Sequence, residues 1–181
     1  MKNKKARVLI VPGLNGSGPG HWQTLWEEKY NFERVEQRDW TKPDLVEWVK
    51  VLNSVITSGS ERAVLVAHSL GCFLVGHWAH AYPEYTGRVR SALLVAPPDV
   101  ERSPHIPESL NRFAVHAPLP FPSILVGSEN DHYVTLESAR RLAADWGSRF
   151  VNAGDAGHIN PDSGHGPWPA GEPLLLDIIK A

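Results

Sequence analysis

The stretch Ala63-Val64-Leu65-Val66-Ala67-His68-Ser69-Leu70-Gly71 decides the fold, because in it an apolar strand runs directly into a serine flanked by small residues. A serine at the apex of a sharp strand-to-helix turn needs small residues two positions before and two positions after it. Ala67 and Gly71 fill these positions, although the usual pattern has glycine at both. An ordinary helix N-cap serine is the alternative. The apolar run 72–82 that follows predicts a helix and favours a nucleophile elbow, with Ser69 as the nucleophile.

Length, composition and charge indicate one globular domain over residues 1–181. The chain has 181 residues, of which 42% are hydrophobic and 21% charged. It is long enough to bury one full hydrophobic core but too short for two domains of ordinary size. The formal net charge of −2, without a basic run beyond Lys4-Lys5, argues against nucleic-acid binding. We expect a monomer or a small homo-oligomer.

The expected location is the cytoplasm, without membrane contact. The apolar run 8–11 stops at Pro12, too early for a signal-peptide core or a membrane span. The single cysteine, Cys72, excludes an internal disulfide and fits a reducing compartment. We expect Cys72 to be a small core residue rather than a nucleophile, since it would point into the packed body.

Short apolar runs alternate with helical segments along the chain. Strands are predicted at residues 7–11, 34–37, 63–67, 91–95, 123–127 and 149–152. Helices are predicted at 22–29, 44–54, 69–82, 136–146 and 174–180. This alternation predicts a doubly wound, mostly parallel α/β sheet of six strands in the order 2-1-3-4-5-6. Residues 96–122 hold seven of the fifteen prolines, so we expect an irregular excursion with a short helical turn near 109–114.

The predicted strand order places two loops face to face at the carboxyl ends of the first and third strands. One loop carries Ser69, and the other is the glycine-rich stretch 12–18. An oxyanion hole in such a fold uses the N–H after the nucleophile, here Leu70, and an N–H from the facing loop, most simply Leu14. A phosphate cradle is the alternative for the glycine-rich loop. It fits poorly, because neither a P-loop Lys-Ser/Thr nor a G-x-G-x-x-G spacing is present.

A serine nucleophile needs a histidine base, and that base needs a carboxylate to orient it. After the fifth predicted strand comes Asp131, and after the sixth comes His158 in a loop of small residues. We therefore predict Ser69, Asp131 and His158 as a catalytic triad. Glu129 and Asp99 are rival acids, and His165 is a rival base.

Other histidines and acids have less specific interpretations. His68 is expected to point along the sheet edge, whereas His77 and His80 are expected to be hydrogen-bonded structural residues. A metal site can be imagined, but its spacing matches no zinc signature, so we expect no metal and no cofactor; its residues would be Asp155, His158, Asp162 and His165.

With strands, elbow, acid and histidine placed, the chain resembles the α/β-hydrolase superfamily. More narrowly, it resembles the compact serine hydrolases grouped with retinoblastoma-binding protein nine and its bacterial relatives. The matching segments span nearly the whole chain and are residues 11–17, 20–23 with Trp26, 67–72, 128–134 and 157–160. The resemblance implies a minimal hydrolase without a large cap domain, with Ser69, Asp131 and His158 at the matching catalytic positions. Residues 70–74 lack the glutamate of an L-x-C-x-E segment, so retinoblastoma binding is not carried over.

The expected function is hydrolysis of a small ester or thioester through an acyl-enzyme intermediate. Pocket-shaping candidates are Asn15, His21, Trp22 and Phe113, although Trp22 could equally pack between its helix and the sheet. Without a long lid, we expect a shallow site that prefers short acyl groups. The alternatives are a noncatalytic protein-binding domain on the same scaffold and a nucleotide-binding doubly wound domain.

Overall fold

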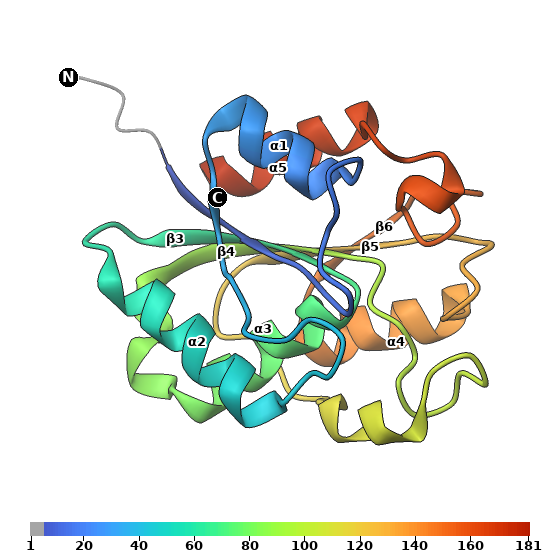
Figure 1. The fold of residues 1–181 in the computed structure, drawn as a ribbon, viewed down its shortest axis with the longest axis horizontal. Helices are drawn as coiled ribbons and strands as arrows, with labels where there is room; N and C mark the ends of the chain where they lie inside the picture. Colours follow the sequence, from blue (N-terminus) through green and yellow to red (C-terminus); the bar gives the residue numbers. More distant parts are fainter. Residues whose placement is uncertain (1–5) are drawn as a thin grey trace.

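The computed structural model describes residues 6–181 and has a six-stranded parallel sheet at its centre (Figure 1). The order is β2-β1-β3-β4-β5-β6, and every neighbouring pair is parallel, as the sequence predicts. The strands are β1 (Arg7–Val11), β2 (Glu33–Arg34), β3 (Ala63–His68), β4 (Val89–Val95), β5 (Ser123–Gly127) and β6 (Arg149–Asn152).

Helices cover both faces of the sheet, in two layers that are separated in Figure 1. One layer contains α1 (Trp22–Tyr30) and α5 (Glu172–Lys180); the other contains α2 (Leu45–Ser58), α3 (Leu70–Ala81) and α4 (Leu136–Trp146). Successive strand residues face opposite layers, so that Leu65 packs in one hydrophobic cluster and Val66 in the other. Burial on both faces explains why the central strands are continuously apolar.

The second strand is shorter than predicted and lies earlier in the chain. It covers only Glu33–Arg34 instead of residues 34–37. The Val35 amide still donates to the Ile10 carbonyl at 2.9 Å, but the chain then leaves the sheet edge. It turns toward the end of β1, where the Trp40 carbonyl accepts from the Asn15 amide at 2.8 Å. An edge strand pairs with a neighbour on one side only, and the residues here are polar. Few contacts therefore hold the chain at this edge, which favours its early departure.

The proline-rich excursion 96–122 is irregular, as expected, with a short 3₁₀ helix at Glu108–Phe113. It is tied to the layer that contains α2 and α3. Arg112 donates to the Pro43 carbonyl at 2.7 Å, and His77 Nε2 lies 3.0 Å from the Phe113 carbonyl oxygen. The Phe113 ring is fully buried and meets Trp48 edge-on. The excursion is therefore anchored at several points.

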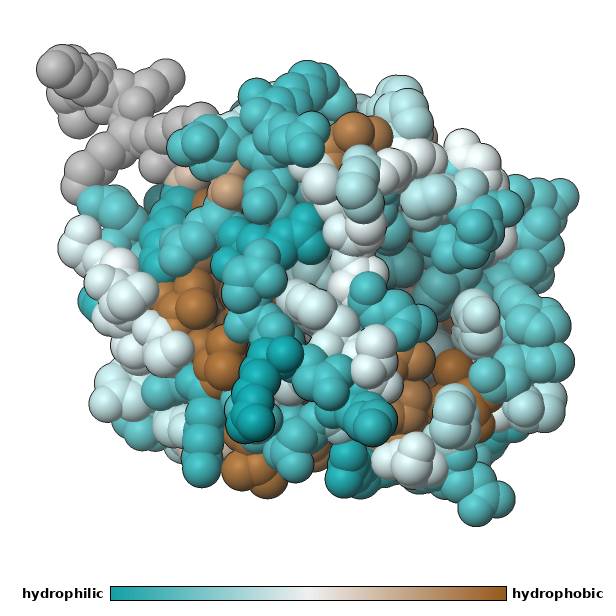
Figure 2. Space-filling view, in the orientation of Figure 1, coloured by the Kyte–Doolittle hydropathy of each residue, from teal (hydrophilic) through white to brown (hydrophobic). Residues whose placement is uncertain are grey.

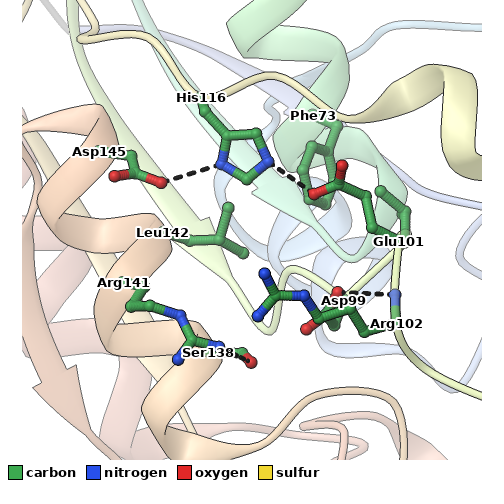
Figure 3. A pocket seen from close by; sticks show the side chains of 10 residues that line it. Phe73, Asp99, Glu101, Arg102, His116, Ser138, Arg141, Leu142 and Asp145 are labelled. Carbon is green, nitrogen blue, oxygen red and sulfur yellow. Dashed lines mark hydrogen bonds and ion pairs between the residues drawn. The ribbon is translucent and has the colours of Figure 1, made fainter.

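A histidine also joins the excursion to α4. His116 Nδ1 lies 2.9 Å from Asp145 Oδ2, and its Nε2 lies 2.7 Å from Glu101 Oε2. Figure 3 shows the imidazole between the two carboxylates, beside a hollow of about 210 Å³ that Asp99, Arg102 and Arg141 also line. The hydrogen bond to Asp145, and then the one to Glu101, raise the pKa of His116 above its ordinary value.

The molecular surface is mostly hydrophilic in the view of Figure 2, with smaller apolar patches among the polar side chains. The exposed large hydrophobic residues are scattered over three elements: Val46 in α2, Tyr85 at residues 83–88 and Leu176 in α5. Within residues 6–181, no helix is both long enough and apolar enough to span a bilayer.

Candidate active site

Ser69 occupies a strained turn between β3 and α3. Its backbone has φ 54° and ψ −126°, a conformation that a residue with a side chain rarely adopts. The Ser69 amide donates to the Val95 carbonyl at 2.9 Å, which ties the turn to the neighbouring strand. A side chain at position 71 would overlap the carbonyl oxygen of Val11, so glycine is needed there. This is the geometry predicted for an elbow.

The structure brings Ser69, His158 and Asp131 together in one chain of hydrogen bonds. His158 Nε2 lies 3.0 Å from Ser69 Oγ, and Nδ1 lies 2.9 Å from Asp131 Oδ2. The carboxylate can only accept, so Nδ1 carries the proton and Nε2 is free to accept from the serine hydroxyl. The side chain of Asp131 is 0% exposed and that of His158 is 11% exposed. The arrangement can therefore move a proton from serine to imidazole.

The acid-bearing and histidine-bearing loops are joined by short polar side chains. Asn130 Oδ1 accepts from the Gly157 amide at 2.6 Å, and Ser128 Oγ accepts from the Ala156 amide at 3.0 Å. These bonds fix the two loops at the ends of β5 and β6 relative to each other. The Tyr133 amide donates to Asp131 Oδ1 at 2.9 Å and so orients the carboxylate.

The glycine-rich loop after β1 passes directly beside the start of α3. A Cβ atom built on Gly13 would lie 2.8 Å from the Leu70 nitrogen, so the two backbones nearly touch. Within residues 6–181, the amides of Leu14 and Leu70 donate to no protein acceptor. Both residues line the cavity over Ser69. Two free amides beside a serine are suited to bind a developing oxyanion.

A cavity of about 650 Å³ opens over Ser69 and His158. Its volume lies within the range of small-molecule sites. The excursion builds one of its walls. The lining residues from the excursion are mostly apolar: Pro98, Val100, His105, Ile106, Pro107 and Leu110. The polar or small lining residues come from the loops after β1 and β6: Asn15, Gly16, Gly18, Gly20, His21, Asn160 and Asp162.

Of the predicted pocket residues, Asn15 and His21 line the cavity, but Trp22 and Phe113 do not. Both of these aromatic side chains are fully buried elsewhere. Trp22 belongs to the core cluster on the α1–α5 side of the sheet, and Phe113 belongs to the cluster on the opposite side. Sequence reasoning missed Tyr133, which lines the cavity and whose ring lies 4.7 Å from that of His158. The sequence signal that could have indicated Tyr133 as a site residue is its position two residues after Asp131.

His68, which was expected to point along the sheet edge, lies at the carboxyl end of β3. Its ring is buried between those of His21 and His158, with centroids 4.7 and 4.9 Å away. Burial, followed by the proximity of His158 and then His21, lowers the pKa of His68 well below its ordinary value. Burial, with Arg34 and His158 nearby, lowers the pKa of His21 to about 4. Both imidazoles are therefore neutral near pH 7.

The rival residues have other partners. Glu129 Oε1 accepts from Asn152 Nδ2 at 2.7 Å, and Asp99 Oδ1 accepts from the Arg102 amide at 3.0 Å. His165 Nδ1 lies 2.9 Å from the Ser163 carbonyl oxygen. No group of three or more potential metal ligands is found within residues 6–181.

Cys72 follows Ser69 by one helical turn but is only 1% exposed. Its Sγ lies 3.5 Å from the Val95 carbonyl oxygen. Burial raises the pKa of the Cys72 thiol far above its ordinary value, so the thiol stays protonated. Cys72 is therefore a core residue, as expected.

The profile that describes serine hydrolases matches residues 8–177, which is nearly the whole chain. The chain belongs to the serine hydrolase family. Among solved structures, this serine hydrolase is similar to a protein described as a YdeN-like hydrolase from Pectobacterium atrosepticum, with 29% identity and a TM-score of 0.86. The match covers 97% of this chain and 91% of the other.

Two more distant structures share the fold of this serine hydrolase. The ydeN gene product from B. subtilis is 18% identical with a TM-score of 0.76, over 98% of this chain and 100% of that one. Est1E from Butyrivibrio proteoclasticus, solved with ferulic acid bound, is 14% identical with a TM-score of 0.69, over 98% and 91%. No curated protein sequence matches significantly. The α/β-hydrolase fold and the serine hydrolase family predicted from sequence are thus confirmed.

Proposed function

We propose that this serine hydrolase is an esterase that acts through an acyl-enzyme intermediate on Ser69. The observation that carries the proposal is the 3.0 Å approach of His158 Nε2 to Ser69 Oγ, with the buried Asp131 carboxylate behind the imidazole. His158 takes the proton as Ser69 Oγ attacks the ester carbonyl carbon. The oxyanion accepts hydrogen bonds from the Leu14 and Leu70 amides.

The second half of the cycle reuses the same groups. His158 returns the proton to the departing alcohol oxygen as the carbonyl re-forms, which leaves the acyl group on Ser69. A water molecule then loses a proton to His158 and attacks the acyl carbon. Ser69 recovers its proton and the carboxylic acid leaves. Throughout, Asp131 holds the Nδ1–H of the imidazole and stabilises its charged form.

The cavity lining supports a substrate class of uncharged esters with an apolar acyl group. Apart from the histidines and Tyr133, Asp162 is the one ionisable side chain in the lining, which contains no lysine or arginine. A carboxylate or phosphate on the substrate would find no counter-ion there. The half-buried Ile106 and the buried Leu110 offer an apolar surface from the excursion.

The test of the chemistry is covalent labelling combined with ester hydrolysis. A fluorophosphonate should give one adduct, mapped to Ser69, and p-nitrophenyl acetate should be hydrolysed. His158→Ala should abolish nearly all activity, whereas His165→Ala should keep most of it. An adduct on another serine, or the reverse order of the two histidine variants, would refute the assignment.

The test of the substrate class is a series of p-nitrophenyl esters. Hexanoate should be hydrolysed at least as well as acetate, whereas a hemisuccinate ester should be poor. Ile106→Ser should lower the hexanoate-to-acetate ratio of kcat/KM by about 10-fold, because part of the acyl chain loses an apolar contact. An unchanged ratio would show that Ile106 of the excursion does not contact the acyl chain.

A noncatalytic protein-binding domain remains the second candidate for function. Its support is weaker, because the exposed large hydrophobic residues of the described chain lie on three separate elements and mark no single docking surface. A chain that takes no fluorophosphonate label and hydrolyses none of the esters would favour this candidate.

A further inference from the structure

The loop that carries His158 has a strained backbone. Gly157 has φ +57° and Ile159 has φ +48°, so both neighbours of the histidine are in the left-handed region. Glycine adopts this region readily, but for a β-branched residue such as isoleucine it is a marked outlier. Such a conformation persists only when surrounding contacts hold it. Those contacts are candidates for a role in catalysis.

Two side chains from distant parts of the sequence hold consecutive carbonyl groups of this loop. Trp22 Nε1–H, from the start of α1, donates to the Ile159 carbonyl oxygen at 2.9 Å. His68 Nε2, from the end of β3, lies 2.9 Å from the His158 carbonyl oxygen. Because a carbonyl oxygen only accepts, His68 Nε2 carries the proton and donates.

Both donors are rigidly placed. Trp22 is 0% exposed and packs among Trp26 and Trp168, with ring centroids 4.8 and 5.0 Å away. His68 meets Trp22 edge-on at 5.9 Å. The side chain of Ile159 is itself 0% exposed in the same core cluster. The loop is thus held by one buried hydrogen bond from α1, one partly buried hydrogen bond from the end of β3, and the apolar anchor of Ile159.

We propose that Trp22 and His68 are positioning residues for the catalytic histidine. They fix the backbone of residues 158–159 and thereby the approach of His158 Nε2 to Ser69 Oγ. The inference rests on the proposed function in so far as His158 is the base. Its physical basis is that a displacement of about 1 Å in a reacting group can cost roughly 100-fold in rate.

The experiment compares donor-deleting variants with matched controls. Trp22→Phe and His68→Phe keep an aromatic ring but lose the donor, and each should lower kcat for p-nitrophenyl acetate by roughly 10- to 100-fold. For Trp22→Phe, KM should change less than about 2-fold, because Trp22 does not line the cavity. His68→Gln should restore most of kcat, since its amide can reach the same carbonyl.

Trp26→Phe is the control for cavity formation. Trp26 lies one turn further along α1, is equally buried, and has its ring contacts with Trp22 and Trp168. The Trp26→Phe variant should keep kcat near the wild-type value even if its melting temperature is lower. If His68→Phe does not fold, His68→Asn replaces it, because the shorter amide cannot reach the His158 carbonyl and should also lose rate.

A second readout does not depend on turnover. The low-field proton resonance of His158 Nδ1–H should be sharp in the wild type and in Trp26→Phe but broadened or lost in Trp22→Phe. Donor-deleting variants that match Trp26→Phe in both kcat and this resonance would overturn the inference. A wild type that is inactive but shows the sharp resonance would instead overturn the proposed function and leave the positioning role standing.

Discussion

Asp131 Oδ2 lies 2.9 Å from His158 Nδ1, although the two residues are separated by 27 positions and follow different strands. The carboxylate is shielded completely from solvent, and its Oδ1 atom also accepts from the Tyr133 amide. The acid is therefore oriented by its own loop before it meets the imidazole. We therefore expect that loss of the carboxylate would affect catalysis more than folding.

Asp131→Asn should lower kcat for a short ester by about 10⁴-fold, by analogy with the serine protease triad, because the amide no longer selects the correct imidazole tautomer. The melting temperature should stay within a few degrees of the wild type. Steady-state kinetics and thermal unfolding measure the two effects.

Glu129→Gln and Asp99→Asn are the matched amide variants for this test. Neither carboxylate is bonded to His158 in the structure, so each change removes only a screened, longer-range field and should cost far less. A crippling Glu129→Gln together with a mild Asp131→Asn would contradict the assignment of the acid.

Gly71→Ala should strongly destabilise the protein. Its added methyl group would overlap the Val11 carbonyl oxygen and lie near that of Pro12, both backbone atoms of β1 and its loop that cannot rotate away. Overpacking of this kind typically costs about 1–3 kcal/mol or more. Gly87→Ala is the control, since a methyl group there would meet nothing within 4 Å. Equal urea midpoints for the two variants would show that β1 and α3 are less closely packed than described.

The buried His21 should make the protein less stable in acid. Its pKa is lowered to about 4 in the folded chain, mainly by burial, whereas the unfolded chain has the ordinary value of about 6.5. Between pH 6.5 and pH 4 the unfolded state binds more protons than the folded state. The free energy of unfolding therefore falls as the pH drops through this window. Across this window, the shifted pKa of His21 should lower the free energy of unfolding by an amount on the order of 3 kcal/mol.

His21→Asn should flatten this dependence. The asparagine amide oxygen can still cap α1, where His21 Nδ1 now accepts from the Gln23 amide, but it does not titrate. Urea unfolding from pH 7 to pH 4 should show a shallower slope than the wild type, with the buried His68 accounting for part of the remainder. Between pH 7 and 8 the two proteins should differ by a constant amount. Parallel curves below pH 6.5 would exclude His21 as a source of acid sensitivity.

His116 should have the opposite pH dependence. Because Asp145 and Glu101 raise its pKa, its stabilising contribution is fully present below the unfolded value of about 6.5 and is lost as pH rises through the folded value. The melting temperature of the wild type should exceed that of His116→Gln at pH 6, and the difference should shrink by pH 8.5. A difference independent of pH would contradict the ion-pair interpretation.

The sequence predicted the fold closely, because strands buried on both faces leave a local signal of continuous apolar residues. The boundaries of β1, β5, β6 and α4 are as predicted, and the sheet order is confirmed. The range predicted for β2 was wrong, because an edge strand with charged residues carries little of that apolar signal.

Site geometry was harder to predict where it depends on contacts between distant layers. Ser69, Asp131 and His158 could be placed together because each follows a strand end, and strand ends share one edge. The direction of the Trp22 and Phe113 side chains depends on how their segments are rotated against other elements, which no local pattern reports. The placement of His68 likewise follows from the position of a loop 90 residues away.

The burial of Cys72 makes the protein a convenient scaffold for site-directed thiol chemistry. It is the single cysteine of the chain, and its sulfur is inaccessible to alkylating reagents in the folded state. Ser69→Cys would thus introduce one reachable sulfur atom at the apex of the elbow, with no need to replace the native residue. Alkylation of that variant would report how open the cavity is to probes of increasing size, independently of any ester substrate.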